Sequence, residues 1–267
     1  MKKKVLLAFS GGLDTSYCAL YLVKERGFEV VAATINTGGF DEIAAIQLQE
    51  KAFSLGASDY KFIDETAHFY EQGIKYLIFG NVLKNNTYPL SVSAERVFQA
   101  MALAYLATEM GVDAIAHGST GAGNDQIRFD LIFQTICPQI EIITPIRDLA
   151  LSREEEISYL QQHGVAGVWE KARYSINEGL WGTSIGGMET LTSNGVLPEE
   201  AFPNQLQEAD AEVVDLRFEK GEPVGLNGTI MTPIDVIKHL NEWGGKYAIG
   251  RDVHVGDTII GIKGRVG

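Results

Sequence analysis

Positive charge is scarce in this sequence. Lys and Arg together number 22 against 35 Asp and Glu, so the formal net charge is −13 at pH 7. Nucleic-acid surfaces need clustered Lys and Arg, and this balance therefore argues against a nucleic-acid partner. Long apolar runs are also lacking, since none reaches the ~20 residues of a membrane-spanning helix. The basic start Lys2–Lys4 precedes an apolar run of only about five residues, which is too short for the core of a signal peptide.

Cysteine is rare as well. Cys18 and Cys137 are the only two, and they form no C-x-x-C pair. We expect two small buried thiols in a reducing compartment, and hence a cytoplasmic protein. The remaining composition, with 45% apolar and 21% charged residues, is typical of a soluble globular protein. A chain of 267 residues is long enough for one large or two modest domains.

Two common phosphate-binding motifs are missing. There is no G-x-x-x-x-G-K-[ST] and no G-x-G-x-x-G. What is present is Lys4–Ser16, KVLLAFSGGLDTS, whose apolar run Val5–Phe9 predicts a buried parallel strand. Ser10-Gly11-Gly12 then allows a tight turn and close approach of a ligand. A helix is expected from Leu13 to about Gly27, with Asp14 or Thr15 as its N-cap.

This strand, turn and helix predict an anion site. Backbone N–H groups and the positive end of the helix dipole converge at such a helix start. We favour this interpretation over an ordinary capped turn because two adjacent glycines lie among three hydroxyls and a carboxylate. The motif S-G-G-L-D-T-S resembles the pyrophosphate loop of the N-type ATP pyrophosphatases, which cleave ATP between its α- and β-phosphates. The resemblance implies ATP held by amides and hydroxyls, with Mg²⁺ screening the charge.

Strands and helices are expected to alternate through the first 163 residues. The expected strands are 29–36, 59–63, 113–117 and 139–144, and the expected helices are 41–55, 65–79, 94–110 and 152–163, with a loop at 81–90. Such alternation implies right-handed βαβ units and a doubly wound, mostly parallel sheet of the α/β class. Ligands of these sheets bind at the carboxyl ends of the strands.

The pattern changes after about residue 164. Alternating residues from Glu212 predict strands with a hairpin turn at Lys220–Pro223, then a helix at Pro233–Trp243 and strand-like Tyr247–Lys263. We therefore expect an ATP-binding pyrophosphatase domain in residues 1–167. An α+β synthetase or substrate domain is expected in residues 168–267.

A second polar cluster is Ala116–Asp130, AHGSTGAGNDQIRFD. It offers three glycines, two hydroxyls, an amide, a carboxylate and Arg128 directly after an expected strand. Such a segment could hold small charged ligands, with the arginine gripping a carboxylate through two hydrogen bonds. The alternative is a flexible surface loop. His117 alone is interpreted as a packing residue at the end of the strand and receives no role in proton transfer.

Together with FSGGLDTS, the segment AHGSTGAGNDQIRF resembles argininosuccinate synthase, whose members carry H-G-x-T-G-x-G-N-D-Q-x-R-F. Further segments agree in order: Tyr88-Pro89-Leu90 leading to Ser93, Tyr174–Trp181 (YSINEGLW), Ile249–Arg251 and Gly261–Lys263. The resemblance therefore runs from Lys4 to the last residue. It implies a Rossmann-like fold of the adenine-nucleotide alpha-hydrolase type, followed by the α+β domain.

The reaction that the resemblance implies is an ATP-driven condensation of citrulline with aspartate in arginine biosynthesis. The ureido oxygen of citrulline attacks the α-phosphate, pyrophosphate leaves, and the aspartate amine displaces AMP from citrullyl-AMP. Such a ligase uses ATP and Mg²⁺. The resemblance also implies a homotetramer in the full-length form, and neither nucleic acid nor membrane as a partner.

The resemblance also assigns residues. Those expected to contact ATP are Ala8, Ser10, Gly11, Gly12, Leu13, Asp14, Thr15, Ser16, Ile35 and Gly118. Those expected to hold aspartate are Thr120, Asn124 and Asp125, and those expected to hold citrulline are Tyr88, Ser93, Asn124, Arg128, Ser175 and Ser184. Asp14, Ser10 and Arg128 are the expected catalytic residues, and no protein ligand of a metal is assigned. Without the resemblance, an ordinary role as solvated loop serines and a role in binding would stand equally open for Ser175 and Ser184.

Three departures from the family pattern stand out. Asn36 and Gly39 lie where many members have D/N-x-G-Q, which puts contacts near the adenosine in doubt. Gly256 lies where the family has a glutamate that binds the amino group of citrulline. Family members also continue beyond the position of Gly267. We therefore expect a truncated second domain, weak activity and poor oligomerisation for this form.

The glycine at position 256 leaves two interpretations open. The substrate could be an N-acylated citrulline, such as N-succinyl or N-acetyl citrulline, which has no amino charge and needs more room. Otherwise Asp252, Asp257 or a residue beyond Gly267 takes over the contact with the amino group.

Two broader alternatives also remain. One is a different N-type pyrophosphatase, such as a tRNA thiolase or an amidotransferase-type synthetase. The acidic charge and the missing cysteine pairs argue against it. The other is a truncated homologue that binds nucleotide without turnover, which the intact pyrophosphate loop opposes.

Overall fold

The computed structural model describes residues 2–121, 123–165, 167, 174–192, 194–208, 210–257 and 263–267. The chain divides into two units. The first comprises Met1–Glu65, Arg96–Ala172 and Thr258–Gly261, and the second Thr66–Glu95, Arg173–Asp257 and Ile262–Gly267. The predicted boundary after residue 167 places residues 66–95 in the first domain, whereas this division groups them with the second.

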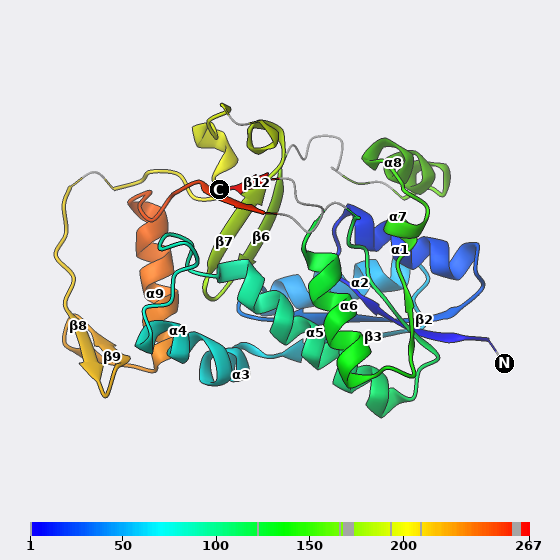
Figure 1. Ribbon diagram of the computed structural model, residues 1–267, viewed down its shortest axis with the longest axis horizontal. Coiled ribbons are helices and arrows are strands. Elements are labelled where there is room, and N and C mark those ends of the chain that lie inside the picture. The colour runs from blue at the N-terminus through cyan, green and yellow to red at the C-terminus, as the bar shows by residue number, and fades with distance from the viewer. Residues whose placement is uncertain are drawn as a thin grey trace. The chain divides into compact units, whose positions relative to one another are not determined.

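A five-stranded sheet forms the centre of the first unit (Figure 1). Its strands are β1 (Lys4–Ala8), β2 (Glu29–Asn36), β3 (Asp59–Asp64), β4 (Ala114–Ala116) and β5 (Glu141–Ile143). Their order is β3-β2-β1-β4-β5, and every pair is parallel. The chain therefore reverses its direction across the sheet between β1 and β4, and ligands of open α/β sheets bind at such a switch point.

Helices cover both faces of this sheet. The bounds are α1 (Leu13–Lys24), α2 (Glu42–Ser54), α5 (Ser91–Met110), α6 (Asp125–Ile136), α7 (Pro145–Asp148) and α8 (Arg153–Gln162). Val5 and Leu7 of β1 pack in one buried cluster with residues of α1, α2, α7 and α8. Leu6 points to the opposite face and packs with residues of α5 and α6. Because side chains alternate along a strand, the apolar run of β1 fills both cores, and the α/β doubly wound class is confirmed.

The second unit contains small antiparallel sheets. These comprise β6 (Ser175–Gly179) with β7 (Gly182–Gly186), β8 (Leu216–Glu219) with β9 (Glu222–Leu226) and β10 (Thr229–Ile230), and β11 (His254–Asp257) with β12 (Lys263–Val266). Its helical segments are α3 (Thr66–Phe69), a π-helical turn (Tyr70–Ile74), α4 (Lys75–Phe79), the first residues of α5, two short 3₁₀ turns (Met188–Leu191 and Glu199–Ala201) and α9 (Pro233–Lys246).

Several expected local features are corrected by the structure. The N-cap of α1 is Gly12, in extended conformation, while Asp14 and Thr15 lie in the first turn of the helix. The helix starts immediately after the glycines because Gly11 turns the chain at a φ of 72°. The expected helix 65–79 contains the π-helical turn.

The expected strand-like segment 247–263 is only partly extended. Helix α9 reaches Lys246, and left-handed residues at Ala248 and Gly250 follow it, so that the strand begins only at His254. Residues 258–262 of the segment, including Gly261 and Ile262, lie outside the described residues.

Two sets of elements were not expected from the sequence: helix α6 within and beyond the second polar cluster, and the hairpin of β6 and β7. Within the part of the chain that the structure describes, no helix is long and apolar enough to cross a bilayer.

Candidate active site

The phosphate loop, Ser10–Ser16, begins where β1 ends. The amide of Phe9 donates to Ala33 O at 2.8 Å, and the Thr34 hydroxyl donates to Phe9 O at 2.6 Å, so the end of β1 is fixed to β2. Gly11 is in the left-handed region, and a Cβ atom there would lie 2.4 Å from Leu48 Cδ2. Helix α1 then starts at Leu13, and backbone N–H groups in a first helical turn have no partner within the helix. The local geometry that an anion site requires, a helix N-terminus after a glycine turn, is therefore present.

The hydroxyls of the phosphate loop differ in their availability. Ser10 is exposed, and its Oγ lies 3.3 Å from Thr15 Oγ1. Ser16 is fully buried, and its hydroxyl donates to Gly12 O at 2.6 Å. Ser10 therefore presents its hydroxyl, with that of Thr15 beside it, at the surface of the loop, whereas Ser16 holds the first turn of α1 together. Of the other expected ATP residues, Ala8 ends β1, Leu13 is buried at the start of α1, and Ile35 is buried in β2.

Lys51 of α2 adds a cation that the sequence argument missed. Its ammonium group donates a hydrogen bond to Gly11 O, and burial lowers the pKa of this lysine. The spacing of 40 residues between the two partners explains why no local motif indicated it. A positive charge beside a phosphate loop complements an anionic ligand.

The two glycine-rich segments meet at one place. Gly118 follows β4 and is buried, and a Cβ atom there would lie 3.1 Å from Asp14 Cβ and 3.2 Å from the Asp14 carbonyl carbon. A side chain at this position would crowd the first turn of α1. The loops after β1 and β4 thus form one surface at the switch point of the sheet, as the sequence predicts.

Asp125 lies between two arginines at the start of α6. Its carboxylate accepts from Arg96 Nε at 3.1 Å and from Arg128 Nη1 at 2.5 Å. Asp125 and Arg128 are expected site residues, and the structure brings them into direct contact. Arg96 was missed, although it lies only three residues after Ser93. Arginines and a carboxylate in one cluster offer partners for both the carboxylates and the amine of an amino acid.

A pair of carboxyl groups underlies the phosphate loop. Glu156 of α8 is only 3% exposed, and its carboxyl group lies beside that of Asp14. Two buried carboxyl groups so close together are not both charged at moderate pH, because like charges repel. Burial and then the charge of Asp14 raise the pKa of Glu156 to about 8. Burial also raises the pKa of Asp14, against the lowering effect of Glu156 and Arg153. Near neutral pH, Glu156 therefore carries the proton of the pair.

Four expected citrulline residues lie in the second unit. The Tyr88 hydroxyl accepts from the Ser91 hydroxyl at 3.4 Å and from the Ser93 amide at 3.5 Å. Ser93 Oγ is buried without a hydrogen-bond partner among the described residues. Ser175 and Ser184 lie on one face of the hairpin β6–β7 as diagonal neighbours, because Ser184 pairs with Asn177, two residues from Ser175.

The hairpin packs closely on the segment that carries Tyr88 and Ser93. Trp181 Nε1 donates to Pro89 O at 2.9 Å, and a Cβ atom at Gly182 would lie 3.2 Å from Ser91 Cβ. These contacts bring the expected residues of the second unit into one neighbourhood. The other expected site residues are in the first unit, where Thr120 is exposed and Asn124 precedes α6.

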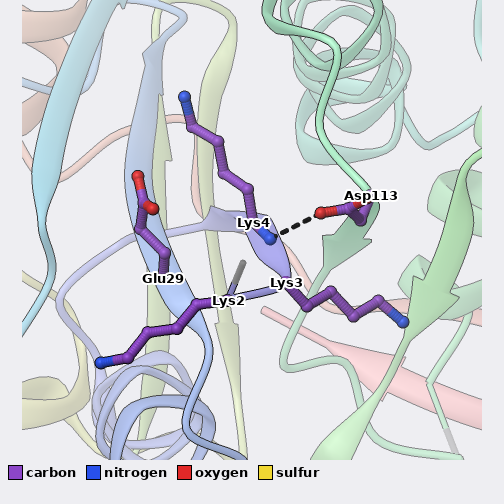
Figure 2. Close-up of a pocket in the computed structure, with 5 residues that line it drawn as sticks. All are labelled: Lys2, Lys3, Lys4, Glu29 and Asp113. Atoms are coloured by element: carbon purple, nitrogen blue, oxygen red, sulfur yellow. Dashed lines mark hydrogen bonds between the residues drawn. The ribbon is translucent and has the colours of Figure 1, made fainter.

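A depression on the first unit lies elsewhere. Figure 2 shows it lined by Lys2, Lys3, Lys4, Glu29 and Asp113. Lys4 and Glu29 are the first residues of β1 and β2, and Asp113 directly precedes β4. This depression is therefore at the amino ends of the strands, opposite the two glycine-rich segments. Within the described ranges, no cluster of three or more metal-ligating side chains occurs.

Comparison with known proteins agrees with this geometry. The profile of the "Arginosuccinate synthase N-terminal HUP domain" matches residues 4–166, and that of the "Arginosuccinate synthase C-terminal domain" matches residues 174–266. The chain belongs to the argininosuccinate synthase family. The argininosuccinate synthase of Methanocaldococcus jannaschii is 39% identical over 268 residues, covering 99% of this chain and 67% of the relative.

Other relatives give the same result. The argininosuccinate synthases of Staphylococcus saprophyticus and Prochlorococcus marinus are 37% and 39% identical, covering 99% and 98% of this chain and 67% of each relative. The expectation that the chain lacks the C-terminal part of the family is not borne out, because the profile of the C-terminal domain matches up to residue 266.

Proposed function

We propose that this chain catalyses the ATP-dependent condensation of citrulline with aspartate through citrullyl-AMP, giving argininosuccinate, AMP and pyrophosphate. The observation that carries this proposal is the close approach of Gly118 to Asp14. It joins the phosphate loop to the segment bearing Asp125 and Arg128, so that a nucleotide and an amino acid can bind side by side. The argininosuccinate synthase family is ATP-dependent, and the relatives carry the name of this activity.

The first half of the reaction needs a triphosphate held at the phosphate loop. Amides of the glycine turn and of the first helical turn, with the hydroxyls of Ser10 and Thr15, would bind phosphate oxygens. Mg²⁺ would enter with ATP as part of the substrate, since this ion usually binds through substrate phosphates and few protein carboxylates. The ureido oxygen of citrulline then attacks the α-phosphate, and the bond to the β-phosphate bridging oxygen breaks as pyrophosphate leaves.

The second half needs aspartate held beside the adenylated citrulline. Thr120, Asn124 and Asp125 would hold aspartate, and Asp125 offers a negative charge to its amine. The amine attacks the ureido carbon, loses its proton, and AMP leaves with the oxygen that carried it. Tyr88, Ser93, Asn124, Arg128, Ser175 and Ser184 would hold citrulline. The chain thus acts chiefly by orienting three substrates, and positioning of this kind supplies several kcal/mol of barrier reduction, roughly 7–11 at best.

The experiment that tests the proposal follows all three products. Purified protein with ATP, Mg²⁺, citrulline and aspartate should form AMP, pyrophosphate and argininosuccinate in equal amounts. Asp14→Ala should abolish pyrophosphate release. The control Asp41→Ala, which removes the N-cap of α2, should lower the stability of the protein but leave pyrophosphate release in place. Pyrophosphate release without argininosuccinate, or full activity of Asp14→Ala, would refute the proposal.

The amino-acid subsite is tested by Arg128→Lys. A lysine cannot reproduce the planar guanidinium fork, and the loss of a charged hydrogen bond costs about 1.5–3 kcal/mol. We expect citrulline to bind roughly 10–100-fold more weakly while ATP binding changes little. A loss confined to ATP would show that Arg128 is misassigned.

The same assay, run with free and with N-acylated citrulline, shows which of the two is the preferred substrate. A Cβ atom at Gly256 would have nothing within 4 Å, so Gly256→Glu should fold normally. If the residue at position 256 contacts the amino group of citrulline, Gly256→Glu should raise kcat/KM for free citrulline relative to kcat/KM for N-acylated citrulline. An unchanged preference would remove the support for an N-acylated substrate.

We also propose a homotetramer for the full-length form and a cytoplasmic location. The free, buried state of both cysteines agrees with a reducing compartment. Sedimentation equilibrium and cell fractionation test these two statements.

A further inference from the structure

His117 is held in one orientation at the end of β4. Its ring is only 1% exposed, and Nδ1 accepts a hydrogen bond from the Ser119 amide at 3.2 Å. Because Nδ1 is an acceptor, the ring proton is on Nε2, which donates to Asp130 Oδ1 at 2.9 Å. The histidine therefore links the backbone after β4 to a carboxylate of α6. This arrangement agrees with a packing role and explains why a buried, polar histidine is tolerated there.

The other carboxylate oxygen of Asp130 continues the chain of hydrogen bonds. Arg147 Nη1, from α7, donates to Asp130 Oδ2 at 2.6 Å and to Gln126 Oε1 at 3.1 Å. Gln126 is buried, and its Nε2 donates to Gly121 O at 2.5 Å. A Cβ atom at Gly121 would lie 3.7 Å from Arg147 Cγ, so the backbone packs against the arginine. We call this series, from the Ser119 amide through His117, Asp130, Arg147 and Gln126 to Gly121 O, the hydrogen-bonded ring.

The ring encloses the segment that the proposed function uses most. Between its two backbone anchors lies only Thr120, an expected aspartate residue, and Gly118 precedes the first anchor. Glycine-rich backbone loses much conformational entropy when it is ordered, so an unsupported segment of this kind would be mobile. Anchors at Ser119 and Gly121 remove that freedom before any substrate binds.

We propose that Asp130 is a positioning residue, which closes the hydrogen-bonded ring and fixes residues 118–121 in the geometry that binds ATP and aspartate. The inference rests on the proposed function for the identity of the two substrates. None of the ring side chains is required to touch them. Asp130 acts through His117 on one side and through Arg147 and Gln126 on the other.

Asp130 suits this position because two donors meet there. A carboxylate has an acceptor for each, whereas an asparagine has one acceptor oxygen and would turn its NH₂ group toward a donor. The negative charge of the Asp130 carboxylate is also stabilised by its neighbours. Burial tends to raise the pKa of Asp130, but the hydrogen bonds from His117 and Arg147, with the charge of Arg147, outweigh burial and lower it.

The test compares Asp130→Asn with Asp113→Asn. Asp113 stands at the other end of β4, where its carboxylate accepts from the Lys4 amide at 2.8 Å, so the same substitution there leaves the ring intact. We expect Asp130→Asn to lower kcat/KM for aspartate about 10–100-fold, since misplacement of a binding group by about 1 Å has effects of this size. Asp113→Asn should stay within about threefold of the wild type, and Asp130→Glu, which keeps both acceptors, should recover part of the loss.

A second readout does not depend on the reaction. Amide hydrogen exchange across residues 117–121 should be at least tenfold faster in Asp130→Asn and unchanged in Asp113→Asn. If the wild type makes no argininosuccinate, the proposed function fails while the exchange measurement still decides the ring. Wild-type protection in Asp130→Asn, or wild-type kcat/KM for aspartate, would overturn the inference. Should Asp130→Asn not fold, Gln126→Met opens the ring from its other side and must give the same two effects.

Discussion

At the scale of single residues, Gly11 and Gly12 show two different uses of glycine within the phosphate loop. Gly11 has a positive φ, and an added Cβ would collide with Leu48. Gly12 has extended dihedral angles, φ −69° and ψ 179°, that any residue adopts. An added Cβ there would meet only Ser10 Oγ, at an ordinary 3.5 Å. The fold therefore needs a glycine at position 11, whereas at position 12 only the proposed binding of phosphate against the backbone would require one.

This difference gives a prediction. Gly11→Ala should lower the free energy of unfolding by about 1–3 kcal/mol, because of strain and overpacking. Gly12→Ala should change it by less than about 0.5 kcal/mol, yet weaken ATP binding at least tenfold. Denaturant unfolding and ATP titration of both variants check this. Normal ATP affinity in Gly12→Ala would show that phosphate does not approach this backbone.

The carboxyl pair of Asp14 and Glu156 predicts a pH dependence. The pKa of Glu156 is about 8 in the folded protein and near 4.5 in an unfolded chain. Between these values the folded state binds the extra proton, so stability falls as pH rises from about 4.5 to about 8. Burial raises the pKa of this carboxyl most; the charge of Asp14 raises it further, and Arg153 lowers it. Burial also raises the pKa of Cys18 and Tyr17 on α1, and Glu156 adds a smaller effect in the same direction.

Glu156→Gln removes this titration and keeps a donor for Asp14. The variant should be more stable than the wild type at pH 8, by about 2 kcal/mol, and the difference should shrink toward pH 5. Unfolding curves of both proteins over this range measure it. Parallel pH profiles would show that the two carboxyl groups do not share a proton.

At the scale of elements, the hairpin β6–β7 depends on a buried contact with α5. Glu95 is 1% exposed, and a Cβ atom at Gly179 would overlap its carboxylate. Gly186, at the other end of the hairpin, has open space around an added Cβ. The two glycines of one hairpin therefore provide a matched pair of substitutions.

We expect Gly179→Ala to cost about 1–3 kcal/mol of stability and to weaken citrulline binding more than ATP binding. Gly186→Ala should be nearly neutral in both respects. Thermal unfolding and substrate titrations distinguish the two. Equal effects of both substitutions would mean that the contact with Glu95 does not hold the hairpin.

Elements also show what could be read from the sequence. The strands of the first unit were predictable because buried parallel strands are apolar on both faces, as Val5–Leu7 illustrates. The capping box of Ser152 and Glu155, which begins α8, was equally visible. Helix α6 was missed because polar site residues fill its first turn and hide its apolar face, which begins at Phe129. Hairpin β6–β7 carries few β-branched or aromatic residues, and its strands gave no alternation.

The candidate site was also only partly predictable from the sequence. Local motifs indicated both glycine-rich segments, because their residues are adjacent in the chain. Lys51 and Glu156 reach the phosphate loop from helices far along the sequence, and only the packing of α2 and α8 against the sheet brings them there. Long-range partners of this kind carry no signal in a single sequence.

At the scale of the whole molecule, the net charge of −13 sets the response to nucleic acids. We expect no tRNA binding at 150 mM salt, since phosphate contacts need clustered cations and weaken steeply with salt. Any binding at low salt should involve Lys2–Lys4 and disappear when these are changed to glutamine. Filter binding with the wild type and this variant measures it. Salt-resistant tRNA binding would instead support a tRNA-modifying pyrophosphatase.

The two cysteines are both buried, free and located in the first unit, Cys18 on α1 and Cys137 at the end of α6. The reactivity of these native thiols therefore reports when the first unit opens. A thiol reagent can label them only when the first unit opens, and burial raises the pKa of both, which slows the reaction further. The labelling rate under native conditions therefore measures the opening of that unit alone, and no probe has to be introduced. A ligand of the phosphate loop should lower the labelling rate in proportion to the fraction of sites that it occupies.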